Sequence, residues 1–198
     1  FTSKDAVRPI LNCIEVETTE KDGTGMTACD SYKLLHCTSK PYGDGWKNPV
    51  GTMLVKWSDI KKSKLISARP KPTMWVAMRQ DESTWSSTPA IEILVFEHDT
   101  LPKEVGRLTI DGVEGTFPKW RQLDSSKSER NAEKQSNVGP GLNTSYLIDV
   151  FRSTELAVSD GGAAVTQFVH GTLMQPIHFM ASNASGESAF ALLMPVRL

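Results

Sequence analysis

The sequence predicts an α+β protein made of antiparallel sheets and short helices, with one structural unit repeated. Two segments, 52–118 and 141–198, each show a strand, a short helix and three further strands. Residues 8–39 show only the three strands that end such a unit, so we interpret them as another copy whose first strand and helix lie before Phe1. Because a small sheet with one helix cannot bury its own face, we expect the copies to pack against each other.

The first copy consists of strands joined by turns. Residues 9–17, PILNCIEVE, alternate apolar and polar side chains as a half-buried strand does. Residues 21–25, KDGTG, have the composition of a turn. Residues 26–38 then predict two more strands, which are joined by a short kink at Asp30 and Ser31.

The second copy follows a loop that contains Pro, Gly and Asn. Residues 52–57, TMLVKW, predict a strand, and residues 58–66, SDIKKSKLI, predict a short helix that Ser58 or Asp59 can cap. Three strand-like runs complete the copy, and a polar hairpin loop separates the first two: TMWVAMR (73–79), AIEILVF (90–96) and VGRLTIDGVEGTFP (105–118).

A polar segment, 124–141, precedes the last copy and contains no large apolar residue except Val138, so we predict a linker. The chain is therefore divided into a domain at 1–123 and a smaller one at 142–198. The smaller domain opens with a short strand edge and a cap at Asn143 or Thr144. It continues with a helix whose apolar face comprises Tyr146, Leu147, Val150 and Phe151. Three strands then end the chain: AAVTQFVHG (163–171), MQPIHFMAS (174–182) and SAFALLMPVRL (188–198).

The composition excludes some classes of protein. Lys and Arg total 22 against 23 Asp and Glu, so the chain is not a generally basic nucleic-acid binder, although it can carry a local basic face. No apolar run approaches the roughly 18 residues of a membrane span, so we expect no membrane partner. An odd and sparse set of cysteines suggests a reducing compartment without a disulfide framework: Cys13, Cys29 and Cys37.

The sequence lacks motifs for catalysis and metal binding. It contains no G-x-S-x-G, P-loop or H-E-x-x-H pattern. Asp111 and Glu114 could form an acid–base pair, but Asp-Gly is primarily turn chemistry. The spacing of Cys29, His36 and Cys37 matches no zinc pattern. We therefore expect no catalytic residues, no metal and no cofactor.

Four segments resemble the bacterial sliding clamp, the beta subunit of DNA polymerase III. RPILNCIEVE (8–17) resembles the strand after the first helix of the clamp's middle domain, and TACDSYKLLH (27–36) resembles its ATDGHRLA segment. IDGVEGTFPKWRQL (110–123) resembles the stretch that closes that domain. GLNTSYLIDVFRS (141–153), together with the terminal LLMPVRL, resembles the end of the last domain.

The resemblance implies a DNA-clamp fold, with antiparallel sheets outside and short helices on the inner face of a ring around duplex DNA. It makes 1–123 similar to the middle domain without its first strand and helix, and 142–198 similar to the final half of the last domain. The clamp's first domain and the first half of its last domain have no counterpart. We interpret the chain either as a shortened clamp relative, such as a phage could encode, or as a partial sequence.

By the same resemblance, cations on the inner helices would contact phosphates without reading bases. The candidates are Lys56, Lys61, Lys62, Lys64 and Arg152. A lysine cluster is also typical of an ordinary solvated helix face, and the second helix bears Asp149 and Glu155 beside its one arginine.

The resemblance also implies a groove that receives a short peptide with apolar anchors from polymerases and clamp loaders. The corresponding residues are Leu11, Cys29, Ser31, Tyr32, Lys33, Leu34, Pro118, Gln122, Leu123, Gln175, Pro176, Leu192, Leu193, Met194, Pro195 and Val196. The family usually has Gly-His-Arg at 31–33 and often has Arg at 122, so the preferred peptide is left open. Without the resemblance, the apolar end of the chain would be interpreted as an edge strand packed into its own core.

We therefore expect a sliding-clamp-like processivity factor, an accessory subunit of a DNA-directed DNA polymerase that performs no chemistry itself. It would hold duplex DNA without sequence preference, tether polymerase and clamp-loader peptides, and form a homo-oligomeric ring by pairing of edge strands. We expect it in the cytoplasm, associated with the nucleoid. The alternative is a clamp-derived interaction module that binds such peptides without encircling DNA. A third interpretation is an unrelated α+β scaffold whose two helices do not share one face.

Overall fold

A computed structural model gives the fold of the protein, which is α+β as predicted. It describes residues 1–3, 7–19, 23–39, 51–63, 74–81, 90–98, 102–123, 141–158, 166–169, 175–184 and 186–196.

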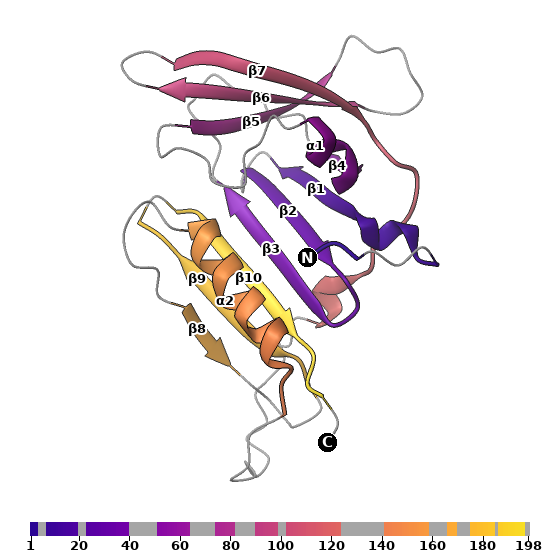
Figure 1. Ribbon diagram of the computed structural model, residues 1–198, viewed down its shortest axis with the longest axis vertical. Helices are drawn as coiled ribbons and strands as arrows, with labels where there is room; N and C mark the ends of the chain where they lie inside the picture. Colours follow the sequence, from indigo (N-terminus) through magenta and orange to yellow (C-terminus); the bar gives the residue numbers. More distant parts are fainter. Residues whose placement is uncertain are drawn as a thin grey trace.

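The larger part of the fold is a seven-stranded antiparallel sheet with the strand order β4–β1–β2–β3–β10–β9–β8. Its strands are β1 (Cys13–Thr19), β2 (Gly23–Cys29), β3 (Lys33–Ser39), β4 (Gly51–Lys56), β8 (Thr166–Val169), β9 (Ile177–Ser182) and β10 (Ser188–Leu193). Strands β3 and β10 pair directly, with Lys33 opposite Leu193 and Thr38 opposite Ser188. The N-terminal and C-terminal parts of the chain therefore share one sheet, which Figure 1 shows as adjacent purple and yellow strands.

A second, three-stranded antiparallel sheet is formed by β5 (Met74–Asp81), β6 (Ala90–His98) and β7 (Pro102–Asp111) (Figure 1). Helix α1 (Trp57–Ser63) follows β4 and contacts both β4 and β7, so it joins the two sheets. The core at this junction draws apolar side chains from α1 and from both sheets: Val16, Val55, Ile60, Ile93 and Ile110.

Helix α2 (Thr144–Val158) covers β9 and β10 (Figure 1). The side-chain oxygen of Asn143 accepts hydrogen bonds from the backbone N–H groups of Ser145 and Tyr146, at 3.0 and 3.2 Å, so Asn143 is the cap among the two predicted candidates. The buried residues of α2 recur at every fourth position, as expected for one face of a helix: Val150, Thr154 and Val158. Val150 packs against residues of β9 and β10: Ile177, Phe179, Ala191 and Leu193.

Some predicted details differ from the structure. Residues 9–12 form the 3-10 helix η1 (Pro9–Asn12) instead of the start of a strand, because Pro9 favours a first helical turn. Residues 141–143 form no strand before α2, since Asn143 already serves as its cap. Phe151, predicted on the apolar face of α2, packs its ring edge-on against Phe179 of β9 at 5.4 Å but stays 40% exposed, and the fully buried residues are Val150, Thr154 and Val158.

The order of elements in the repeated unit is confirmed for the second copy, which contains β4, α1, β5, β6 and β7 in sequence. The first copy contains β1–β3, and the last contains α2 followed by β8–β10. The first and last copies do not form separate sheets, because β3 and β10 merge them. The predicted linker lies outside the described residues, except for Gly141.

No helix in the described part of the chain is long and apolar enough to cross a membrane. Within the same ranges, no group of His, Cys, Asp and Glu side chains is arranged to hold a metal ion. All three cysteines are unpaired.

Candidate functional site

An apolar groove of about 700 Å³ lies where η1, the β2–β3 corner, the end of β10 and the 3-10 helix η2 (Trp120–Leu123) meet. Its walls contain three cationic side chains and no carboxylate. The lining residues are Val7, Arg8, Pro9, Ile10, Leu11, Cys29, Ser31, Tyr32, Lys33, Leu34, Pro118, Lys119, Trp120, Gln122, Leu123, Leu192 and Met194. Such a cavity suits a mainly apolar ligand.

The β2–β3 corner forms one wall of the groove through an unusually tight turn. The carboxylate of Asp30 accepts hydrogen bonds from the backbone N–H groups of Tyr32 and Lys33, both at 3.0 Å. Ser31, which lies between Asp30 and Tyr32, has a φ of 86°, in the left-handed region that favours glycine. The turn therefore holds Ser31 in a backbone conformation that glycine would adopt at a lower cost.

Lys33 connects this wall to helix α2. Its side chain is only 10% exposed, and its ammonium group lies 2.5 Å from the carboxylate of Asp149 and 4.8 Å from the ring centre of Tyr146. The neighbouring Tyr32, which is 57% exposed, stacks on Tyr146 with 5.8 Å between the ring centres. Tyr32 therefore leans toward α2 while it still lines the groove.

Trp120 anchors η2, which forms the opposite wall. Its ring is 6% exposed and lies 4.6 Å from the ring centre of His36, and its N–H donates to the carboxylate of Glu15 at 3.1 Å. Arg121 covers the outer side of the Trp120 ring at 4.5 Å and forms an ion pair with Glu17. These contacts fix the positions of the groove residues that end η2, Gln122 and Leu123.

His36 is neutral at physiological pH in this setting. Its pKa is lowered to about 4, mainly by burial and also by the positive charge of Arg121, while the negative charge of Glu17 opposes the shift. The ring nitrogen Nδ1 is 2.9 Å from the hydroxyl oxygen of Thr27. Gly25 leaves the space that the ring occupies, because a Cβ at that position would lie 2.9 Å from the His36 ring.

The end of β10 supplies the third wall. The backbone N–H of Met194 donates to the carbonyl oxygen of Tyr32 at 2.8 Å, which holds the strand end against the β2–β3 corner. Because side chains of a strand alternate between its faces, Leu192 and Met194 line the groove, whereas Leu193 is fully buried beneath α2.

Eleven of the residues that the clamp resemblance assigned to the groove therefore line one cavity: Leu11, Cys29, Ser31, Tyr32, Lys33, Leu34, Pro118, Gln122, Leu123, Leu192 and Met194. Five others do not line it. Leu193 faces α2, and Gln175 and Pro176 precede β9, one strand further from β3. Pro195 and Val196 lie past the strand end, where the N–H of Val196 donates to Gly141.

Sequence reasoning missed the contribution of η1 and part of η2 to the cavity: Val7, Arg8, Pro9, Ile10, Lys119 and Trp120. Trp120 belongs to the FPKW stretch, which carries part of the clamp resemblance, so the sequence did contain a signal that Trp120 lines the groove. The helical turn of η1 brings Arg8 and Ile10 to the groove. It was not predicted, because the alternation of apolar and polar residues there is typical of a strand.

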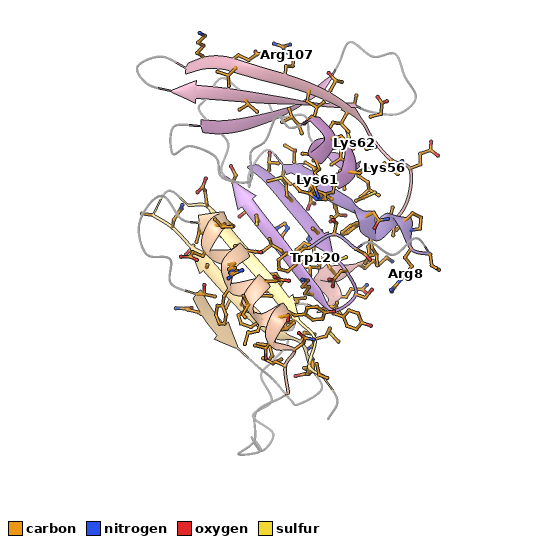
Figure 2. The ribbon with its side chains drawn as sticks, viewed as in Figure 1. Arg8, Lys56, Lys61, Lys62, Arg107 and Trp120 are labelled. Atoms are coloured by element: carbon orange, nitrogen blue, oxygen red, sulfur yellow. The ribbon has the colours of Figure 1, made fainter. Side chains whose placement is uncertain are left out.

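The candidate DNA-contacting residues do not form one cluster. Lys56, Lys61 and Lys62 are exposed and lie close together around α1 (Figure 2), and Lys62 is 3.6 Å from Asp59. Arg152 is exposed on α2, which covers β9 and β10 rather than the β4 side of the sheet. Lys64 lies outside the described residues.

The fold matches that of bacterial sliding clamps. The DNA polymerase III beta subunit of Thermotoga maritima aligns with all of this chain and 60% of its own chain, at a TM-score of 0.57 and 13% identity. A sliding clamp from Bartonella birtlesii bound to griselimycin aligns with 99% of this chain and 60% of its own, at 0.52 and 14%. The beta chain of Streptococcus pneumoniae aligns with all of this chain and 60% of its own, at 0.50 and 12%.

The protein therefore has a sliding-clamp fold, as the sequence resemblance implied. The chain spans about 60% of the length of these clamps. No protein-family model matches the chain, and no curated protein matches its sequence.

Proposed function

We propose that this protein binds short peptide segments of replication proteins in the groove and thereby tethers them. The observation that carries the proposal is the groove itself: an apolar cavity of about 700 Å³, with three cations and no carboxylate in its lining, on a sliding-clamp fold. Its occupant is a segment of a DNA polymerase or a clamp loader. Apolar anchors of that segment fill the cavity.

Buried and partly buried apolar groups provide the binding surface. Leu11, Leu34 and Leu192 are each buried, whereas Met194 and Leu123 remain 36% and 49% exposed. Each anchor that leaves water for such a surface contributes roughly 1.5–3 kcal/mol. Two anchors together contribute about 3–6 kcal/mol, so a dissociation constant in the tens of μM is about the tightest that they support on their own.

Tethering of this kind requires no chemistry from the chain. A polymerase held by a peptide stays at a high effective concentration near its template, so it continues synthesis after each dissociation of its active site. We accordingly propose an accessory, non-enzymatic role in DNA replication, in the cytoplasm and close to the nucleoid.

The same proposal includes a contact with duplex DNA through the cations around α1. Lys56, Lys61 and Lys62 are exposed, and phosphate contacts made by lysine are independent of sequence. A closed ring would need more than one copy of a chain that spans about 60% of a clamp. Pairing between the β4 and β8 edges of the large sheet would provide the contact between subunits.

A second candidate function is an interaction module that binds the same peptides without surrounding DNA. It is favoured by the exposed charges of α2, which are one arginine and two carboxylates and so do not attract phosphate. Binding to a circular duplex at several salt concentrations distinguishes the two. The clamp binds the circle and loses affinity as salt increases, whereas the module does not bind it.

The groove itself is tested by fluorescence anisotropy with a labelled peptide that contains Gln followed by Leu and Phe anchors. The test variant is Leu123→Asp, which places a charge at the groove wall. The matched control is Val105→Asp, because Val105 is 47% exposed on β7, outside the groove. We expect micromolar binding that Leu123→Asp weakens at least tenfold and Val105→Asp leaves unchanged. Absence of binding by the unaltered protein, or equal effects of both variants, would overturn the proposal.

A further inference from the structure

Helix α1 carries a tryptophan that is accessible to solvent. Trp57 is 41% exposed, whereas Trp120 beside the groove is 6% exposed, and the buried residue of α1 is Ile60. Single exposed apolar residues are common, but tryptophan has the largest apolar surface of all side chains and the most to gain from burial. Trp57 therefore keeps an aromatic surface available to a ligand.

Helical spacing places Trp57 beside a lysine and away from the one carboxylate of α1. Residues four apart are neighbours on a helix surface, so Lys61 lies next to Trp57. Asp59 is two residues from each of them, and residues two apart do not face each other. The carboxylate of Asp59 lies 3.6 Å from the ammonium group of Lys62. The side of α1 that carries Trp57 and Lys61 thus presents an aromatic ring and a positive charge.

A second lysine adds to this charge. Lys56, the last residue of β4, directly precedes Trp57, and both Lys56 and Lys61 are exposed. Within the described ranges, neither of these two lysines forms an ion pair. Figure 2 shows Lys56, Lys61 and Lys62 gathered around α1. The surface around Trp57 is therefore positively charged, although the whole chain carries a net charge of −1.

An exposed aromatic ring among lysines is the combination that binds single-stranded nucleic acid. The ring stacks on an unpaired base, and the ammonium groups contact the phosphates beside it. A duplex makes no use of the ring, because its bases are already stacked on each other, and so it contacts only the lysines. A lipid surface fits less well, since an interfacial helix needs a wide apolar face and α1 has seven residues with Ile60 turned into the core.

We propose that Trp57, Lys56 and Lys61 form a contact site for single-stranded nucleic acid. One base stacks on the Trp57 ring, and the two ammonium groups contact neighbouring phosphates. The site goes beyond the duplex contact proposed above, which needs the lysines but not the ring. It also lies apart from the peptide groove, whose lining includes none of these three residues. Because stacking does not read the edges of a base, the site has little sequence preference.

The contact is weak and sensitive to salt. One stacked base and two phosphate contacts give an expected dissociation constant on the order of 100 μM at low salt. The release of counterions from two phosphates predicts that the logarithm of the affinity falls against the logarithm of the salt concentration with a slope of about −1.4.

Fluorescence anisotropy tests the site with the full chain and labelled oligomers of about 20 nucleotides. The probes are oligothymidylate, oligouridylate and a duplex of the same length. Trp57→Ala and Lys61→Ala should each weaken single-strand binding about fivefold or more, whereas Trp57→Phe keeps an aromatic ring and should weaken it less. Duplex binding should weaken in Lys61→Ala but not in Trp57→Ala. The matched controls Leu156→Ala and Lys103→Ala remove an exposed apolar group and an exposed charge elsewhere, and should leave binding unchanged.

Tryptophan emission provides a readout that a purely structural role of Trp57 would not change. A base stacked on an indole ring quenches its fluorescence, so addition of unlabelled oligothymidylate should quench the emission of the protein. Trp57→Phe should remove most of this quenching, although four of the five tryptophans remain. Circular dichroism checks that the variants are folded. If Trp57→Ala does not fold, the loss of quenching in Trp57→Phe decides the question.

The outcomes separate this site from the other proposals. Absence of single-strand binding at about 500 μM protein would overturn it. So would single-strand binding that Trp57→Ala leaves unchanged, or quenching that persists in Trp57→Phe, because the lysines alone would then make the contact. A preference for oligothymidylate or for oligouridylate would support the site and assign its ligand to DNA or RNA. Single-strand binding without duplex binding would support the site and refute only the duplex contact.

Discussion

The burial of His36 predicts that the protein loses stability between pH 7 and pH 5. The pKa of this histidine falls from 6.5 to about 4 in the folded protein, first because of burial and then because of the nearby charge of Arg121. The unfolded chain therefore binds a proton on His36 as the pH falls through 6.5, whereas the folded protein stays unprotonated until about pH 4. The proton binds the unfolded state preferentially, so stability decreases as the pH falls through this window and is greatest above pH 6.5.

The size of the effect follows from the same values. A shift from 6.5 to about 4 corresponds to a loss of about 3 kcal/mol at most, and about 2 kcal/mol of it falls between pH 7 and pH 5. The ring is only partly shielded from solvent, so we expect about 1–2 kcal/mol over that interval after screening. The measurement is urea unfolding followed by circular dichroism at pH 7, 6 and 5.

The matched variant is His36→Asn, which keeps a polar atom near Thr27 but cannot be protonated. The variant is expected to be less stable at pH 7, because it loses the ring contact with Trp120. Its stability should change less between pH 7 and pH 5 than that of the unaltered protein, by about 1 kcal/mol or more. Parallel pH dependences of the two proteins would refute the reasoning.

Three further changes test the walls of the groove. Ser31→Gly should stabilise the protein by about 0.5–1 kcal/mol in thermal unfolding, because glycine adopts the φ of 86° without strain. A loss of stability would mean that the turn is not strained. Lys33→Met should destabilise the protein by about 0.5–1 kcal/mol in urea unfolding, because it removes the ion pair to Asp149, whose side chain is 51% exposed and stays solvated. An unchanged midpoint would show that this ion pair contributes nothing. Trp120→Phe should lower the free energy of unfolding by about 1 kcal/mol, because it loses the hydrogen bond to Glu15. The control Trp57→Phe, at a position 41% exposed, should be nearly neutral. Equal losses of stability in the two variants would show that Trp120 does not anchor η2.

The elements of the fold could be predicted from the sequence wherever alternation or helical spacing was the dominant signal. The strands that became β2, β3, β9 and β10 were found this way, as was the cap at Asn143. The turn of η1 was not predicted, because the alternation of residues 9–17 indicated a strand and outweighed the preference of Pro9 for a first helical turn. The pairing of β3 with β10 could not be predicted either, because the periodicity of a strand indicates which of its faces is buried but not which strand lies next to it.

In the candidate site, too, some features could be predicted from the sequence and others could not. Residues quoted within the clamp-like segments, such as Leu11, Leu34 and Met194, converge on one cavity. Leu193 was assigned to the groove together with its neighbours, although alternation along β10 turns it to the opposite face. The low pKa of His36 could not have been predicted, because it depends on Trp120 and Arg121 approaching from a distant part of the chain.

The β3–β10 seam, where these two strands join the N-terminal and C-terminal parts of the large sheet, has a consequence for how the protein folds. The hydroxyl groups of Thr38 and Ser188 meet across this seam, although 150 residues separate them in sequence. During synthesis at roughly 5–20 residues per second, β3 waits on the order of ten seconds or more for its neighbour to emerge. Over that time its edge is unpaired and can pair with β3 of another nascent chain. Contacts of such long range also slow folding in general. The seam that unites the two parts of the native protein is thus the place where newly made chains are most prone to aggregate.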